Sequence, residues 1–497
     1  MDRLKAWLGE GLILVPTVLL LGLLLFALSF RLERLSNLAE ILPIETDAFF
    51  VVNMEDFVAS GSPVDEAYLK EFIGVPLNEL TWFKRDLGVA WIDGNAVEFL
   101  EVKSKQGAED FFTALVEGEE LKNNALNEDI RCFEIESLCF KFEGDFLVFS
   151  GSPEALVAVD APGPGLEDNE HYQNVRGRVG HLESGFVYVN LETAQEFFPQ
   201  SLFLKSILQI FPAWGASIRM EPQGWYAESF TAVDKNVISG AYFHPDVNYE
   251  QKFLPWTKAF AWEWGAQNLA AQVTRMQEIF AKLGSTGEMI FTSTLESNLR
   301  DFFGDTDLSE ALALLDGESY FGWTSPEDFL FILELENEED LQKAETLKNK
   351  FLQNYSFKQT YVDEKGEEKA EVTALTESPK EYEGHPYLLL KAGEKTIAAF
   401  TFTEDAAIVT ASEETLLTVL YVKDGRQSGR DLEEISVLLP GSNEIWILDS
   451  AFLPEGDILG VRLSTLTRLM STRKIFDDGV FTRTSLLPSR SETEAKQ

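Results

Sequence analysis

Residues that could carry out acid–base or nucleophilic chemistry are present, but they form no complete catalytic motif. Ser471 and Lys474 spell Ser-x-x-Lys, the spacing of a serine nucleophile and a lysine, yet the accompanying Ser-Asp-Asn and Lys-Thr-Gly elements are missing. There is no Gly-x-Ser-x-Gly elbow, P-loop or Gly-x-Gly-x-x-Gly turn. The four histidines have no His-Glu-x-x-His spacing (His171, His181, His244 and His385). We predict no catalytic residues and no cofactor.

A group of acidic residues could bind calcium or cap a helix. Four carboxylates occur within ten residues (Asp301, Asp305, Asp307 and Glu310), and oxygen ligands suit Ca²⁺. The run lacks the central glycine and the loop spacing of an EF-hand. Asp307 followed three residues later by Glu310 is also the spacing of a capping box, which is the simpler interpretation. We therefore predict no metal site.

The candidate binding residues are aromatic. Phe260, Trp262 and Trp264 alternate along a predicted strand, so they share one face of it, and Trp446 adds a further large ring. Such a face usually belongs to a buried core, but aromatic platforms also bind sugars and lipids. These four residues are a candidate ligand groove. The sequence leaves core and groove both open.

The chain has two cysteines, Cys132 and Cys139, which flank a predicted hairpin. A two-residue turn at residues 135–136 would set them opposite each other, where a disulfide could form in an oxidising compartment. A register one residue different would not. The bonded and the free state both stay open.

An apolar run near the N-terminus bears on where these side chains would be located. Gly11 to Phe30 contains no charge, and twenty helical residues reach about 30 Å, the thickness of a hydrocarbon core. We expect a transmembrane helix at residues 11–30, with residues 1–10 cytoplasmic and the bulk extracytoplasmic, because the terminal amine adds to the positive charge of the short tail. A cleaved signal peptide ending near Ala27–Ser29 and a buried core helix are the alternatives.

Composition restricts the class of partner. The chain has 497 residues, 41 Lys+Arg and 83 Asp+Glu, and a formal net charge of −42. An acidic surface repels phosphate backbones, so nucleic acid is excluded as a partner. The roughly 460 residues beyond the anchor exceed the usual size of one domain.

Phrases that recur in the same order indicate an internal duplication. Residues 99–102 (Phe-Leu-Glu-Val) correspond to residues 332–335 (Ile-Leu-Glu-Leu) at an offset of 233. Residues 139–154 correspond to residues 399–414 at an offset of 260. The change in offset predicts an insertion of 27 residues in the second copy, near residues 356–384, as an extended hairpin or a flexible loop.

A further pair, residues 186–190 and 445–449, has an offset of 259 and supports the same alignment. The predicted segments beyond the anchor are then two repeats and a polar tail (39–252, 253–488 and 489–497). Short turns at residues 143–145 and 393–394 favour antiparallel hairpins. We expect an α+β fold, with two tandem homologous domains of curved antiparallel sheet and packed helices after the transmembrane helix.

The opening of the first repeat carries a resemblance. Leu42-Pro43-Ile44-Glu45-Thr46-Asp47-Ala48, followed by a hydrophobic strand, resembles an uncharacterised bacterial domain-of-unknown-function family with an N-terminal membrane segment and tandem domains that open on Leu-Pro-x-x-Thr-x-Ala. The second copy departs from this pattern, because one residue fewer separates Pro255 from Ala259. The resemblance implies a bacterial envelope protein and supplies no catalytic residues.

Together these features predict a membrane-anchored extracytoplasmic binding or scaffolding protein of the bacterial envelope. Its partner would be an envelope protein, a glycan or an apolar ligand. An envelope hydrolase or transferase with a dispersed site is the alternative.

Overall fold

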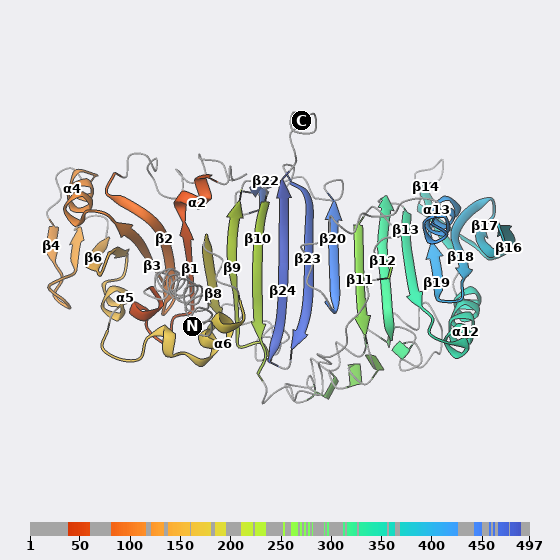
Figure 1. The fold of residues 1–497 in the computed structure, drawn as a ribbon, viewed down its shortest axis with the longest axis horizontal. Helices are drawn as coiled ribbons and strands as arrows, with labels where there is room; N and C mark the ends of the chain where they lie inside the picture. Colours follow the sequence, from red (N-terminus) through yellow and green to blue (C-terminus); the bar gives the residue numbers. More distant parts are fainter. Residues whose placement is uncertain are drawn as a thin grey trace, which may run out of the picture.

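The computed structural model (Figure 1) describes most of the chain beyond residue 37. The described residues are 38–59, 81–115, 121–133, 138–159, 161–179, 184–194, 210–221, 224–234, 252–253, 260–266, 316–325, 328–354, 357–362, 368–425, 442–449, 457–458, 461–462, 466–476 and 478–488, with isolated positions between 269 and 313.

Ten strands of the first half pair in one antiparallel order. From the outer edge inward, this order is β4 (Leu121–Asn123), β5 (Arg131–Phe133), β6 (Cys139–Glu143), β7 (Phe146–Ser150), β3 (Asn95–Val102), β2 (Phe83–Ile92), β1 (Ala48–Asn53), β8 (Gly185–Asn190), β9 (Ala213–Glu221) and β10 (Gly224–Ala232).

Ten strands of the second half pair in the same order. They are β16 (Leu375–Tyr382), β17 (His385–Ala392), β18 (Lys395–Phe402), β19 (Ala406–Thr410), β13 (Asp328–Glu334), β12 (Gly317–Ser325), β11 (Phe260–Ala266), β20 (Glu444–Asp449), β23 (Leu466–Phe476) and β24 (Gly479–Pro488).

The strand registers follow the sequence offsets. Phe99 of β3 pairs with Val148 of β7, and the residues 233 and 260 positions further on, Ile332 and Ile408, pair with each other. The duplication stays a prediction, and this matched pairing supports it. A separate hairpin of β14 (Phe357–Val362) and β15 (Glu368–Thr373) lies in the stretch near residues 356–384 where the insertion is expected. A second small hairpin pairs β21 (Asp457–Ile458) with β22 (Val461–Arg462).

The last strands of the two halves, β10 and β24, pair with each other. In the described part of the chain, twenty strands thereby form one antiparallel sheet that runs through both halves. The expected α+β class with two domains, each a sheet with packed helices, is therefore wrong. The physical reason is that each half leaves an unpaired strand edge, and the two edges satisfy each other's backbone hydrogen bonds.

The described helices are mostly short and occur on both halves of the sheet (Figure 1). They are α2 (Met54–Ala59), α4 (Lys105–Leu115), α5 (Pro153–Ala158), the 3₁₀ turn η2 (Leu166–Asp168), α6 (Glu170–Arg178), α7 (Leu191–Ala194), α12 (Glu338–Asn354) and α13 (Glu413–Lys423). α5 begins as its sequence predicts: the Ser152 hydroxyl accepts from the Ala155 amide at 3.2 Å, and Pro153 occupies the first helical position.

Alternating side chains give the sheet two different faces. On one face, which we call the α6 face, α5, α6 and α13 cover a core that includes Phe49, Tyr188, Ile332 and Ile445. On the other face, which we call the aromatic face, α4 packs over Leu100 and Leu147, and α12 packs over Ala407. The central strands β10, β23 and β24 carry mostly half-buried side chains on both faces.

Among the helices that the structure describes, none is both long enough and apolar enough to cross a membrane. The expected transmembrane helix at residues 11–30 lies outside the described residues.

Candidate functional site

The predicted aromatic residues come together on the aromatic face. Phe260, Trp262 and Trp264 alternate along β11, and Trp262 lies directly opposite Trp446 of β20. On the other side of β11, Phe260 lies opposite Trp323 and Trp262 lies opposite Phe321. We call these six side chains the aromatic cluster (Phe260, Trp262, Trp264, Phe321, Trp323 and Trp446).

The rings of the cluster contact one another. Trp262 stacks on Trp446 with ring centroids 4.7 Å apart and planes inclined by 20°, and it also lies 4.4 Å from Trp264. Phe260 lies 4.8 Å from Trp323, which meets Phe321 edge-on at 5.0 Å. These separations are those of attractive aromatic pairs, so the cluster is a packed ladder of rings across three strands.

One carboxylate orients the indoles. Glu444 Oε1 accepts a hydrogen bond from Trp262 Nε1 at 3.0 Å and another from Trp446 Nε1. Its other oxygen accepts from Arg473 Nη1 at 2.7 Å. With both N–H groups directed to Glu444, the two rings are fixed in orientation and present carbon surface elsewhere. The motif analysis missed Glu444, whose signal is its position two residues before Trp446 on the same strand face.

Burial distinguishes this cluster from a core. The residues between its members point to the α6 face and are fully buried there, including Ala261, Ile445 and Ile447. Phe260 is buried, whereas Trp262, Trp264 and Trp446 are half-buried and Trp323 is 39% exposed. The cluster is therefore a partly exposed surface on the sheet. The sequence suggests either a buried core or a ligand groove, and the structure shows neither at these described residues.

Hydroxyl groups border the cluster toward the middle of the sheet. Ser471 of β23 lies opposite Trp446 and Thr484 of β24 lies opposite Ser471, with their oxygens 3.1 Å apart. One step along the strands, Thr482 lies opposite Arg473, and Ser229 of β10 lies opposite Thr482. Ser229, Ser471, Thr482 and Thr484 are half-buried, and we call them the hydroxyl strip.

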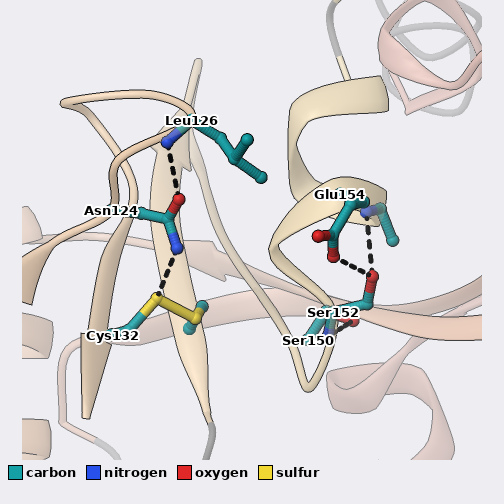
Figure 2. The surroundings of a disulfide bond; sticks show 8 residues. Asn124, Leu126, Cys132, Ser150, Ser152 and Glu154 are labelled. Carbon is teal, nitrogen blue, oxygen red and sulfur yellow. Dashed lines mark hydrogen bonds between the residues drawn. A yellow bond between two sulfur atoms is a disulfide. The ribbon is translucent and has the colours of Figure 1, made fainter. Parts of the chain in front are cut away.

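The two cysteines are bonded. Cys132 of β5 and Cys139 of β6 are directly paired, with Cα atoms 4.0 Å apart, and a disulfide joins them. Figure 2 shows Asn124 beside this bond: its side-chain amide donates to Cys132 Sγ at 3.4 Å and its carbonyl accepts from the Leu126 amide at 2.8 Å. The disulfide ties the short edge strands β5 and β6 together, far along the sheet from the aromatic cluster.

The Ser-x-x-Lys spacing does not form a catalytic pair. Ser471 and Lys474 lie on one strand, β23, where residues three apart point to opposite faces. Ser471 belongs to the hydroxyl strip, and Lys474 lies on the α6 face. The spacing brings a serine and a lysine together only on a helix.

Histidines and acidic groups provide no metal centre in the parts of the chain described. His171 lies 3.7 Å from Glu192 and His385 lies 3.4 Å from Asp424, each a single contact. No group of three or more His, Cys, Asp or Glu side chains among the described residues could hold a metal ion. His181, His244 and the acidic group at residues 301–310 lie outside those residues.

Three further carboxylates, one each on β11, β12 and β13, bind the backbone. Glu263 accepts from the Phe253 amide at 2.9 Å, Glu318 accepts from the Lys252 amide at 2.9 Å, and Glu334 accepts from the Glu318 amide at 2.8 Å. Glu263 and Glu318 thus hold Lys252 and Phe253, which precede β11, whereas Glu334 bonds the backbone at the start of β12.

Comparisons with known proteins add little. No family model matches the chain, and no curated protein matches it. Among solved structures, crystal form III of TP0453 is 12% identical with a TM-score of 0.26, and the match covers 39% of this chain and 79% of that one. Form IV is 10% identical with a TM-score of 0.27 over the same shares, and form I is 10% identical with a TM-score of 0.24 over 39% and 78%. Scores this low do not establish a common fold.

Proposed function

We propose that this is a non-enzymatic, membrane-anchored extracytoplasmic protein of the bacterial envelope, and that the aromatic cluster with the hydroxyl strip binds an extended glycan. The observation that carries the proposal is that four indole rings share one sheet face, three of them half-buried and that of Trp323 39% exposed, instead of lying within a fully buried core. The anchor at residues 11–30 and the resemblance to an envelope family support the location.

The chemistry of this surface suits a sugar chain. A pyranose ring has a face of C–H groups that packs on an aromatic ring and an edge of hydroxyls that needs hydrogen-bond partners. Here the indoles supply the first, and Ser471, Thr484 and Arg473 supply the second beside them. Ser471 and Thr484 bond each other and keep further hydrogen-bonding capacity that a purely apolar ligand would not use, and a nucleic acid would meet a chain of net charge −42.

Binding of soluble oligosaccharides to the detergent-solubilised full-length protein, measured by calorimetry, tests this proposal. Trp323→Ala removes the most exposed ring of the cluster and is expected to weaken binding by about tenfold or more, which corresponds to roughly 1.4 kcal/mol.

The matched control is Trp91→Ala. Trp91 is also 39% exposed and occupies the position on β2 that corresponds to Trp323 on β12, since it pairs with the start of β1 as Trp323 pairs with the start of β11. It lies outside the cluster, so its loss should leave binding unchanged. Equal effects of the two substitutions, or no binding across the panel of oligosaccharides, would contradict the proposal.

A further inference from the structure

The junction of the two halves has a local two-fold symmetry. The hairpins β9–β10 and β23–β24 turn at matching places, since Gly224 pairs with Glu221 and Gly479 pairs with Phe476. The strands that leave these turns, β10 and β24, then pair antiparallel with each other. Two equivalent antiparallel strands are related by a two-fold axis perpendicular to the sheet. We call the β10–β24 pairing the seam. It has the geometry by which identical subunits join edge to edge.

The residues at the centre of the seam are equivalent to each other. Glu228 is the fourth residue after Gly224, Arg483 is the fourth after Gly479, and the strand register places Glu228 directly opposite Arg483. The pairs on either side are symmetric about this point, because Trp225 lies opposite Leu486 and Thr231 lies opposite Val480. At a two-fold centre a residue faces its own equivalent, so pairing of like halves would place two copies of the same side chain opposite each other at this position.

The two halves do differ there, and with opposite charge. Arg483 Nη2 lies 2.6 Å from Glu228 Oε1, and Arg483 Nε donates to the same oxygen at 3.1 Å. The side chains are 33% and 16% exposed, so the pair is largely shielded from solvent. If β10 instead met β10 of another copy, Glu228 would face Glu228, and if β24 met β24, Arg483 would face Arg483. Like charges directly opposite each other on neighbouring strands are destabilising.

We infer that Glu228 and Arg483 determine which strand edges pair: they select the joining of first half to second half and oppose the pairing of like halves from two copies of the chain. An open strand edge is a template for any similar strand, and edges this alike need a feature that discriminates between them. A pair of opposite charges at the symmetry centre provides it, because this is the position at which pairing of like halves sets identical charges against each other.

Charge reversal in the full-length protein tests the inference. Glu228→Arg and Arg483→Glu each place like charges at the seam, and each is expected to lower the thermal midpoint by at least about 2 °C. The double variant, Glu228→Arg with Arg483→Glu, restores opposite charges and should recover most of that loss.

Co-expression of the two single variants with different affinity tags gives a second readout. Reciprocal exchange of halves between an E228R chain and an R483E chain creates two Glu–Arg pairs, so the tags should co-purify as a 1:1 dimer, as measured by light scattering. Co-expressed wild-type chains should not associate. A matched control uses Lys84→Glu with Glu101→Lys, an ion pair between β2 and β3 inside the first half, which exchange of halves cannot restore. Loss in the double variant equal to the sum of the single losses would overturn the inference.

Discussion

Glu444 shows how a single side chain determines the character of the aromatic cluster. Its two oxygens accept from two indole nitrogens and one guanidinium, drawn from three neighbouring strands. A half-exposed indole could rotate among several orientations, and a shared charged acceptor restricts two of them at once. The same contacts hold β11, β20 and β23 in register at this position.

Replacement of Glu444 is therefore expected to loosen the cluster. Glu444→Leu leaves both indole N–H groups without their acceptor and should lower the free energy of unfolding by about 1–3 kcal/mol, with the lower value favoured by the partial exposure of the site. Glu444→Gln keeps an acceptor oxygen and should cost less. Denaturant unfolding followed by tryptophan fluorescence measures both, and an equal loss for Leu and Gln would show that the indole hydrogen bonds contribute nothing.

Glu98 is a residue at which charge and surroundings conflict. It lies on β3 between Val89 of β2 and Phe149 of β7, and burial raises the pKa of its carboxyl above the usual 4.5. The folded state thus holds the proton more tightly than the unfolded state does. Its contribution to stability is fully present below the unfolded pKa and is lost as the pH rises through the folded pKa.

Glu98→Gln removes this dependence. At neutral pH the variant is expected to have a higher thermal midpoint than wild type, because no charge remains to be desolvated. The difference should shrink as the pH falls below about 4.5, where both states of the wild-type carboxyl are protonated. Thermal unfolding from neutral to acidic pH checks the sign: a gain that grows with acidification would contradict this assignment.

At the scale of elements, a glycine sets how closely α6 approaches the sheet. A Cβ built on Gly215 of β9 would lie 2.5 Å from Val175 Cγ1 of α6 and 2.8 Å from the Val187 carbonyl oxygen of β8. Neither contact is possible without movement, so this strand residue must lack a side chain for the helix to pack over the core of the first half.

Gly215→Ala should consequently destabilise the protein by about 1–3 kcal/mol through overpacking. Gly177 of α6 provides the opposite case, since nothing lies within 4 Å of a Cβ built there and the residue is exposed. Gly177→Ala should stabilise by about 0.5–1 kcal/mol through helix propensity. Chemical denaturation of the two variants measures the difference, and effects of the same sign would refute this account of the packing.

Element registers also explain what the sequence could and could not predict. The offsets of 233 and 260 match the pairing of β3, β6 and β7 with that of β13, β18 and β19, and the offset of 259 matches the pairing of β8 with that of β20. At β11 the Leu-Pro phrase equates Ala48 with Ala259, but pairing equates Ala48 with Phe260, since these face Trp91 and Trp323. A shift of one residue exchanges the two faces of a strand. The alignment by the Leu-Pro phrase would place the aromatic cluster on the buried face that carries Phe49. The partial exposure of the cluster therefore could not be deduced from the sequence.

At the scale of the whole molecule, the fold class failed for a different reason. The strands and their antiparallel neighbours within each half follow from local turns and alternation, whereas β10 and β24 are separated by more than 200 residues and no local pattern marks them as partners. Their pairing turns two expected sheets into one. The acidic composition, by contrast, restricts partners without any knowledge of the fold.

The pairing of β10 with β24 also determines how far the continuous sheet extends from β1 to its outer edge. Thirteen inter-strand steps separate β1, near the point where the chain enters the sheet, from the outer edge strand β16. At about 4.8 Å per step this is a span of roughly 60 Å, somewhat less with twist. For a chain tethered at its N-terminal end, one continuous sheet carries its far edge that distance without a hinge. In a chain anchored as proposed, the continuous sheet would separate the tether from β16 by this span.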